Sequence, residues 1–264
     1  MELTNILYAA MAIGGLGLLF GLGLGFAAKK FAVEVDPLVP IVRDLLPGAN
    51  CGGCGFAGCD AFANALVKGE ARPNGCPVNN SDNTTQIASA LGQEATVGEK
   101  TAAFVKCNGT CDVASEKYEY YGIKDCQSAA YLQGTGSKGC EYGCLGLGSC
   151  FNVCMFDAIT IENGVAVIDE DKCVSCGMCV DACPKNIIEI VRVSGRTRVK
   201  CNSKDKGKEV KAKCQVGCIG CGICVKQCED DAIHVTDALA KIDYDKCINC
   251  GKCVAKCPTK AIVN

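Results

Sequence analysis

Cysteine is the residue type in this chain that could do most chemistry. The 264 residues include 25 cysteines but a single histidine, so catalytic triads and metal sites built on histidine have little to draw on. Many cysteines recur in tight C-x2-C-x2-C runs, and bridging thiols so close in sequence would constrain the unfolded chain very little. The odd number of cysteines and the length of the chain also argue against a disulfide scaffold. We therefore interpret the cysteines as metal ligands, which lose their protons on binding.

The first group of cysteines lies in the stretch NCGGCGFAGC and in the GCP that follows it. Its members are Cys51, Cys54, Cys59 and Cys76. The glycines that crowd this stretch let the backbone fold tightly and bring amide N–H groups close to sulfur. A zinc ribbon is the alternative, because C-x2-C pairs also bind zinc. The glycines and the three-plus-one spacing favour an iron–sulfur cluster.

Most of the other cysteines belong to a duplicated segment. CEYGCLGLGSCFNVC, beginning at Cys140, aligns with CQVGCIGCGICVKQC, beginning at Cys214, and the residues that follow align as well. This is similar to the C-x2-C-x2-C-x3-C-P pattern of bacterial two-cluster ferredoxins, in which the fourth cysteine of each run binds the other run's cluster. Each copy has two runs, although Met155 and Glu229 replace the proline after the first run.

The ferredoxin crossover implies four further clusters. In the first copy Leu147 stands where the second copy has Cys221, so the first copy is expected to recruit Cys140 for its first run. The four expected ligand sets are Cys154, Cys173, Cys176 and Cys179; Cys140, Cys144, Cys150 and Cys183; Cys228, Cys247, Cys250 and Cys253; and Cys218, Cys221, Cys224 and Cys257.

Five cysteines remain outside these sets: Cys107, Cys111, Cys126, Cys201 and Cys214. We predict a sixth cluster held by Cys107, Cys111 and Cys126, completed by Cys201 or Cys214. The alternative is that these thiols are inert and buried. The chain is therefore expected to hold five or six [4Fe–4S] clusters.

The N-terminal segment that carries this body is apolar. No charge occurs from Leu3 to Ala28, a stretch longer than the roughly 20 helical residues that cross a bilayer. A cleaved signal peptide would begin with a basic region, but the only early charge is Glu2. Lys29 and Lys30 follow at once, which by the positive-inside rule places the rest of the chain in the cytoplasm. We predict a single-pass anchor in a bacterial cell membrane.

The remaining sequence predicts an α+β fold of small units. We expect a transmembrane anchor over 1–30, a four-cysteine iron–sulfur domain over 31–80 and a polar linker over 81–104. Two tandem two-cluster ferredoxin-like domains should follow, over 105–191 and 192–264. A short helix is expected over 57–68, stopped by Gly69, and short strands over 158–161, 165–169 and 240–243.

A basic segment lies between the two copies. Residues 192–213 carry nine lysines and arginines against Asp205 and Glu209, and Gly195 and Gly207 suggest the turns of a hairpin. Such a run is often just a solvated face. In a chain made anionic by its clusters it could instead steer an acidic redox partner, a soluble ferredoxin. Nucleic acid is not expected, because no aromatic residues interleave these charges.

Together these parts resemble the B subunits of the Rnf complex, the membrane-bound ferredoxin:NAD+ oxidoreductase of bacteria. NCGGCGFAGC is the most specific stretch, backed by CEYGCLGLGSC. The resemblance implies an electron-transfer subunit of a complex that passes electrons from reduced ferredoxin to NAD+ and exports sodium ions or protons. It also implies membrane and cytoplasmic partner subunits that carry the NAD, flavin and ion sites, so this chain has no catalytic residue of its own.

Two other functions fit parts of the pattern. One is a polyferredoxin subunit of a membrane hydrogenase or formate-type dehydrogenase, which the partners that co-purify would reveal. The other is a membrane-tethered iron–sulfur redox sensor, which needs an output domain that the sequence does not show. The first cysteine group and the anchor favour the Rnf-type function over the polyferredoxin subunit.

Overall fold

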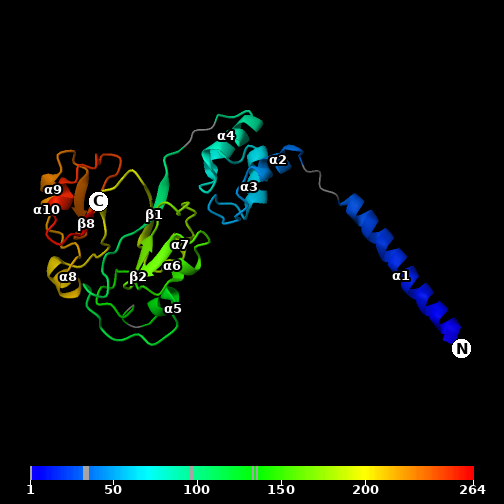
Figure 1. The fold of residues 1–264 in the computed structure, drawn as a ribbon, viewed down its shortest axis with the longest axis horizontal. Helices are drawn as coiled ribbons and strands as arrows, with labels where there is room; N and C mark the ends of the chain where they lie inside the picture. Colours follow the sequence, from blue (N-terminus) through cyan, green and yellow to red (C-terminus); the bar gives the residue numbers. More distant parts are fainter. Residues whose placement is uncertain (1, 32–35, 95–97, 133, 135) are drawn as a thin grey trace.

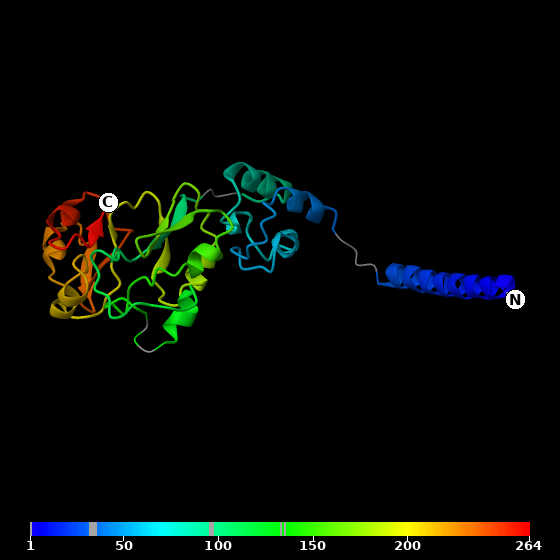
Figure 2. The same ribbon diagram turned by 60° about the horizontal axis from the view of Figure 1, so that its bottom comes forward.

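The computed structural model describes residues 2–31, 36–94, 98–132, 134 and 136–264. Figure 1 shows helix α1 at one end, then a small helical module, then a larger body that holds both copies of the duplicated segment. Figure 2 shows the same succession from another direction. The cysteine-rich parts therefore lie at one side of the anchor.

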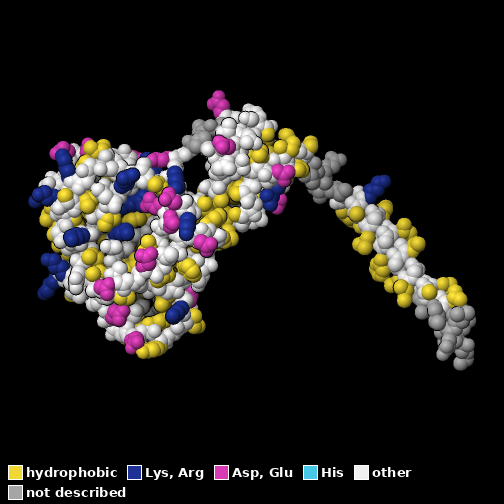
Figure 3. Space-filling model, viewed as in Figure 1, with side chains coloured by type: hydrophobic (Ala, Val, Ile, Leu, Met, Phe, Trp, Pro, Cys, Tyr) yellow, Lys and Arg dark blue, Asp and Glu magenta, His cyan; other side chains and the backbone are white. Residues whose placement is uncertain are grey.

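Helix α1 spans Glu2–Lys30 and stands apart from the rest of the chain. Its stretch Ala10–Lys30 has a mean hydropathy of 1.9, and none of it is buried within the protein. Apolar side chains cover its surface in Figure 3. The helix is long and apolar enough to cross a membrane, as the sequence predicts.

The N-terminal module consists of α2 (Leu38–Asp44), α3 (Cys59–Val67), a 3-10 turn (Pro73–Gly75) and α4 (Ser81–Ala90). Phe62 and Leu66 lie one turn apart on α3 and are each 1% exposed. They pack with Val42 and Ile87 in one apolar core. The helix predicted over 57–68 is confirmed, and Gly69 follows it with a φ of 75°.

The predicted linker over 81–104 is wrong at both ends. Helix α4 begins where the Asn80 side chain accepts a hydrogen bond from the Asn83 N–H, and it buries Ile87 in the module's core. Asn83 also donates to the carbonyl oxygen of Leu45 at 3.0 Å. At the other end β1 (Thr101–Val105) already belongs to the larger body. The sequence predicts a short helical stretch around 84–91 within this linker, and α4 confirms it. The polar sequence did not reveal that this helix packs into the module or that β1 follows, because only a few apolar residues anchor the two elements.

The larger body consists of two ferredoxin-like units, each with two two-stranded antiparallel sheets. In unit 1, β1 pairs with β4 (Ile188–Arg192), and β2 (Ile159–Glu162) pairs with β3 (Val165–Ile168). In unit 2, β5 (Arg198–Val199) pairs with β8 (Ile262–Val263), and β6 (Ile233–Thr236) pairs with β7 (Leu239–Ile242). The three predicted strands are confirmed. The outer sheets join strands that are distant in sequence, which local patterns do not reveal.

Within the described residues, six short helices carry or flank the cysteines of these units. They are α5 (Cys126–Ala130), α6 (Ser149–Asn152), α7 (Met178–Asp181), α8 (Gly207–Lys213), α9 (Ile223–Gln227) and α10 (Lys252–Lys256). Four of them begin after a glycine in the left-handed conformation: Gly148, Gly177, Gly222 and Gly251. Glycine adopts that conformation without a steric penalty, so it sets the turn from cysteine loop to helix.

The basic segment over 192–213 is not the predicted hairpin. Its first residue ends β4, residues 198–199 form β5 in the other unit, and Gly207 begins α8 rather than a turn. Arg198 is 5% exposed, pairs with the carboxylate of Glu170 and lies 5.1 Å from the ring centre of Phe104. The segment crosses between two units, so part of its charge is used inside the protein.

Candidate cluster sites

Two hollows in the ferredoxin-like units are each lined by four cysteines that coincide with an expected set. Cys154, Cys173, Cys176 and Cys179 line the hollow in unit 1. Cys228, Cys247, Cys250 and Cys253 line its counterpart in unit 2. In both, three thiols come from one run and the fourth from the other run. This is the crossover that the ferredoxin pattern implies.

A third hollow differs from the expected set, because Cys126 takes the place of Cys140. Its lining thiols are Cys126, Cys144, Cys150 and Cys183. The backbone N–H of Cys126 donates to the hydroxyl of Ser149 at 2.7 Å, and that hydroxyl donates to Asp125 at 2.5 Å. These bonds hold α5 against α6, beside Cys150. The hydrogen bond from Ser149 is the main cause that lowers the pKa of Asp125, to about 2.

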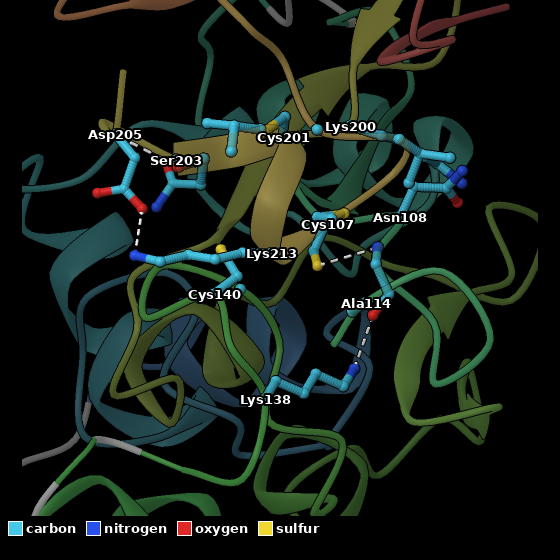
Figure 4. A pocket seen from close by; sticks show the side chains of 17 residues that line it. Cys107, Asn108, Ala114, Lys138, Cys140, Lys200, Cys201, Ser203, Asp205 and Lys213 are labelled. Atoms are coloured by element: carbon cyan, nitrogen blue, oxygen red, sulfur yellow. Dashed lines mark hydrogen bonds and ion pairs between the residues drawn. The ribbon is translucent and has the colours of Figure 1, made fainter. Parts of the chain in front are cut away.

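The displaced Cys140 lies in a hollow between the two units, here called the central site. Its lining includes Cys107, Cys140 and Cys201, which Figure 4 labels, and also Cys214. Cys107 and Cys201 each belong to a VKCN stretch that leaves β1 or β5, and Cys140 aligns with Cys214 in the duplication. The structure thus groups Cys107 with Cys140, Cys201 and Cys214, and it does not bring Cys111 or Cys126 into this hollow, where the sequence predicted them.

Cys111 is the cysteine left over. It is exposed, its backbone N–H donates to the carbonyl oxygen of Asn163 at 3.0 Å, and it lines none of the hollows described above. The repeated VKCN stretch was the sequence signal that could have separated Cys107 from Cys111, because it pairs Cys107 with Cys201.

In the two remaining expected sets, the thiols lie close enough for their charges to act on one another. Burial raises the pKa of the Cys76 thiol, and the nearby charges of Cys54 and Cys51 act in the same direction. Burial likewise raises the pKa of Cys224 to about 11, with Cys218 and Cys221 adding to it. Cys218, Cys224 and Cys257 share the core of unit 2. The expected sets of the N-terminal module and of unit 2 are thus consistent with the structure.

The electrostatics of these groups favour a bound metal cluster. Burial, followed by the charge of neighbouring thiols, raises the pKa of Cys150 and of Cys179 to about 12. A thiolate there needs positive charge close by, which iron supplies. Among the described residues, no three His, Cys, Asp or Glu side chains come close enough together to hold a single ion. The thiols of each hollow are therefore spaced more widely than the ligands of a single ion, which suits a cluster better than zinc.

The groups follow one another in space. Gly53, in the N-terminal module, approaches the backbone of Cys176, and the charge of Cys51 acts on Cys176. The backbone N–H of Cys144 donates to the Cys107 sulfur of the central site at 3.3 Å. The N–H of Cys218, in unit 2, donates to the Cys201 sulfur at 3.2 Å. The central site is therefore in hydrogen-bonded contact with the nearest group of each unit.

Fold and sites define an iron–sulfur protein of the multi-cluster ferredoxin type. Family models agree: an Fe-S cluster family matches residues 46–78, a 4Fe-4S binding domain matches residues 166–189, and a 4Fe-4S dicluster domain matches residues 217–261. The chain is thus an electron carrier with [4Fe–4S] clusters.

Curated relatives place it more narrowly. It is 51% identical over 245 residues to the B subunit of the Na+-translocating ferredoxin:NAD+ oxidoreductase complex of Acetobacterium woodii, covering 92% of this chain and 73% of that one. It is 47% identical to the B subunit of the ion-translocating oxidoreductase complex of Methanosarcina acetivorans, covering 98% and 99%. The proton-translocating counterpart of Clostridium ljungdahlii is 47% identical, with 86% and 81% covered. The chain belongs to this family of Rnf-type B subunits, and as a member of it is associated with the membrane.

Proposed function

We propose that this chain is a membrane-anchored wire of six [4Fe–4S] clusters within an ion-translocating ferredoxin:NAD+ oxidoreductase. It takes electrons from a reduced ferredoxin and passes them to partner subunits. Its six ligand sets are Cys51, Cys54, Cys59 and Cys76; Cys154, Cys173, Cys176 and Cys179; Cys126, Cys144, Cys150 and Cys183; Cys107, Cys140, Cys201 and Cys214; Cys218, Cys221, Cys224 and Cys257; and Cys228, Cys247, Cys250 and Cys253. The clusters supply one-electron storage.

The observation that carries this proposal is the order in which the cysteine groups follow one another in space. The N-terminal module meets unit 1, unit 1 meets the central site, and the central site meets unit 2. At each of these three contacts, the neighbouring cysteine groups share a hydrogen bond or interact through their charges. The chain's own residues do no bond chemistry: they hold the clusters, exclude water around them and fix their sequence along the molecule.

We infer the direction of electron transfer from the position of the anchor helix. The module nearest α1 lies at the membrane end, and unit 2 lies at the far end (Figure 1). We propose a single-pass anchor with the body on the cytoplasmic side, as Lys29 and Lys30 indicate. Electrons from a soluble donor then enter at the far part of the body and leave toward membrane subunits.

A basic surface beside the central site suits an acidic donor. Lys204, Lys206, Lys208 and Lys211 lie on and before α8 and are exposed, and α8 runs directly into Cys214. Basic side chains gather at this end of the molecule in Figure 3. We propose that a soluble ferredoxin docks here, since opposite charges speed encounter and fix orientation.

The cluster count is the first test. Anaerobically purified full chain should contain about 24 iron and 24 labile sulfide atoms, as six clusters require. The double variant Cys201→Ala with Cys214→Ala should contain about 20 of each, with the other clusters retained. An unchanged count in this double variant would contradict the central ligand set, and iron near zero in the wild type would contradict the wire itself.

The docking surface has a separate test. Stopped-flow reduction by a reduced ferredoxin should slow about tenfold or more when Lys204, Lys206, Lys208 and Lys211 are all replaced by glutamine. The matched control replaces four other exposed lysines of unit 2: Lys241, Lys246, Lys256 and Lys260. Equal slowing in both variants would show a general charge effect and no docking site at α8. A smaller salt dependence in the first variant alone would support it.

The names of the relatives favour this function over the two alternatives. The three relatives described above are named as subunits of ion-translocating oxidoreductases, and two of them name ferredoxin and NAD+. None of these three is named as a hydrogenase, formate dehydrogenase or sensor subunit.

A further inference from the structure

Lys138 is a buried ammonium beside the central site. The residue is 5% exposed, and its Nζ donates to the carbonyl oxygens of Gly109 at 2.7 Å and Gly164 at 2.6 Å. Figure 4 shows its side chain extending along the wall of the site below Ala114. Lys138 takes part in none of the ion pairs found among the described residues. A buried cation without a carboxylate is costly, so its position calls for another negative group.

The cysteines of two neighbouring groups would provide that negative charge as cluster ligands. The charge of Lys138 acts on Cys214 of the central site and on Cys144 of the neighbouring group in unit 1. The residue aligned with Lys138 in the second copy is Ala212. The cation is therefore a specific feature of this position and is not inherited from the repeated cluster-binding pattern.

Basic residues are more numerous at the central site than at the other three hollows. Lys138, Lys200 and Lys213 line it, and the ammonium of Lys213 is partnered by Asp205 at 2.8 Å. The hollow of Cys126 is lined by one lysine, Lys185. The outer hollows of the two units have neither lysine nor arginine in their lining. Among these lysines, Lys138 combines burial with the lack of an ion pair.

Backbone donors add to this. The Cys107 sulfur accepts the backbone N–H groups of Gly109 at 3.4 Å and Cys144 at 3.3 Å, and the Cys201 sulfur accepts that of Cys218 at 3.2 Å. Hydrogen bonds to sulfur and nearby positive charge both stabilise a cluster that has gained an electron.

We propose that the cluster at the central site has the highest reduction potential in this chain and that the charge of Lys138 raises that potential. The inference rests on the proposed function, which places a [4Fe–4S] cluster there. In the step concerned, one electron arrives from a low-potential donor, which is oxidised; no bond forms or breaks and no proton moves. An electron that has reached the centre is then held between the two units until the next acceptor is free.

A redox titration followed by EPR tests this on the anaerobically purified full chain, with dithionite as the reductant. In Lys138→Gln the amide can still donate to a carbonyl, but the charge is gone. We expect the wild-type iron content and a lower midpoint for the highest-potential cluster. At the wild-type midpoint, the ratio of reduced to oxidised cluster should fall about tenfold. Lys138→Arg keeps the charge and should keep the midpoint.

Lys106→Gln is the matched control. Lys106 precedes Cys107 in the sequence, but its ammonium pairs with Glu189 at 3.0 Å and is partly exposed. The Lys106→Gln variant removes the same formal charge and should leave the midpoint potentials of all clusters unchanged. An unchanged midpoint in Lys138→Gln, an equal shift in Lys106→Gln, or a loss of about four irons in Lys138→Gln would each overturn the tuning role.

A second measurement does not depend on any Lys138 variant. In the Cys201→Ala and Cys214→Ala double variant, the highest-potential signal should vanish while the others remain. Loss of a lower-potential signal would overturn the inference and leave the proposed function intact. Retention of all iron and every signal would contradict the central ligand set, and with it the proposed function.

Discussion

Cys111 and Cys126 lie on the same long segment between β1 and α6, yet the structure gives them different surroundings. Cys126 is 9% exposed and is tied through Ser149 to α6. Cys111 is exposed and stands outside the hollows lined by four thiols. Neither belongs to a C-x2-C run, so spacing does not distinguish them. Their burial and hydrogen bonds do.

This difference predicts unequal effects of two alanine variants. Cys126→Ala should lower the content of iron and labile sulfide by about four atoms each per chain, because a ligand is lost. Cys111→Ala should leave both contents unchanged. The measurement is iron and sulfide per chain after anaerobic purification of both variants in parallel. Loss of about four irons from Cys111→Ala as well as from Cys126→Ala would restore the sixth ligand set predicted from the sequence.

At the scale of elements, one cysteine loop in each unit packs closely against a neighbouring β-hairpin. Gly146 has a φ of 72° and lies against Gly164, at the turn between β2 and β3. Gly220 repeats this in unit 2, where it has a φ of 65° and faces Ala238 between β6 and β7. Glycine is required twice over here, for the backbone conformation and for the close approach.

Gly146→Ala should therefore destabilise the protein more than Gly177→Ala. Both positions have a positive φ, which costs a non-glycine residue about 1–2 kcal/mol. Only at Gly146 would the added methyl group overlap the backbone of Gly164; at Gly177 it meets nothing within 4 Å. Anaerobic denaturant unfolding of the cluster-loaded proteins measures the difference. Equal losses of stability would show that the hairpin yields easily at this contact.

The cores of the three folded parts differ in their cysteine content. Cysteine supplies four of the eleven buried residues in the core of unit 1 and three of nine in unit 2. In the N-terminal module it supplies one of eight, beside Phe62, Leu66 and Ile87. Clusters therefore replace much of the apolar packing in the units but less of it in the module.

Removing the iron should consequently unfold the two units before the module. After anaerobic chelation, amide hydrogen exchange should become fast throughout residues 101–263, while α3 and α4 keep measurable protection. Hydrogen exchange with peptide-level mass spectrometry compares these regions in one sample. Simultaneous loss of protection in all three parts would mean that the module also depends on its cluster for folding.

At the scale of the whole molecule, the N-terminal module meets unit 1 through a close backbone contact. A Cβ atom on Gly53 would lie 2.7 Å from the carbonyl oxygen of Cys176. Gly53 precedes Cys54, and Cys54 and Cys176 are both proposed cluster ligands. The contact therefore sets how closely the membrane-end group approaches the rest of the wire.

Gly53→Ala should push the two parts away from each other and slow electron transfer between them several-fold. Gly55→Ala is the control within the same loop, because its methyl group would meet nothing within 4 Å although its φ is 83°. Rapid-freeze EPR after mixing with a reduced donor follows the arrival of electrons at the module. Slowing in Gly55→Ala alone would indicate that strain in the loop, and not the contact, controls the transfer.

The sequence by itself determined the residue types, the duplication, the anchor and most of the chemistry of this protein. Cysteine runs recur at fixed spacing because consecutive thiols of one run bind the same cluster, so local sequence is enough to reveal them. The apolar helix is equally local, since its length and lack of charge show in any window.

Only the tertiary structure decided which isolated thiols meet. Cys107, Cys140, Cys201 and Cys214 come from both units, and Cys126 reaches its group on an inserted segment held by Ser149. Likewise β1 and β4 are brought together from opposite ends of unit 1. The physical reason is the same in each case. These contacts join residues far apart in sequence, and packing between elements, rather than spacing along the chain, determines them.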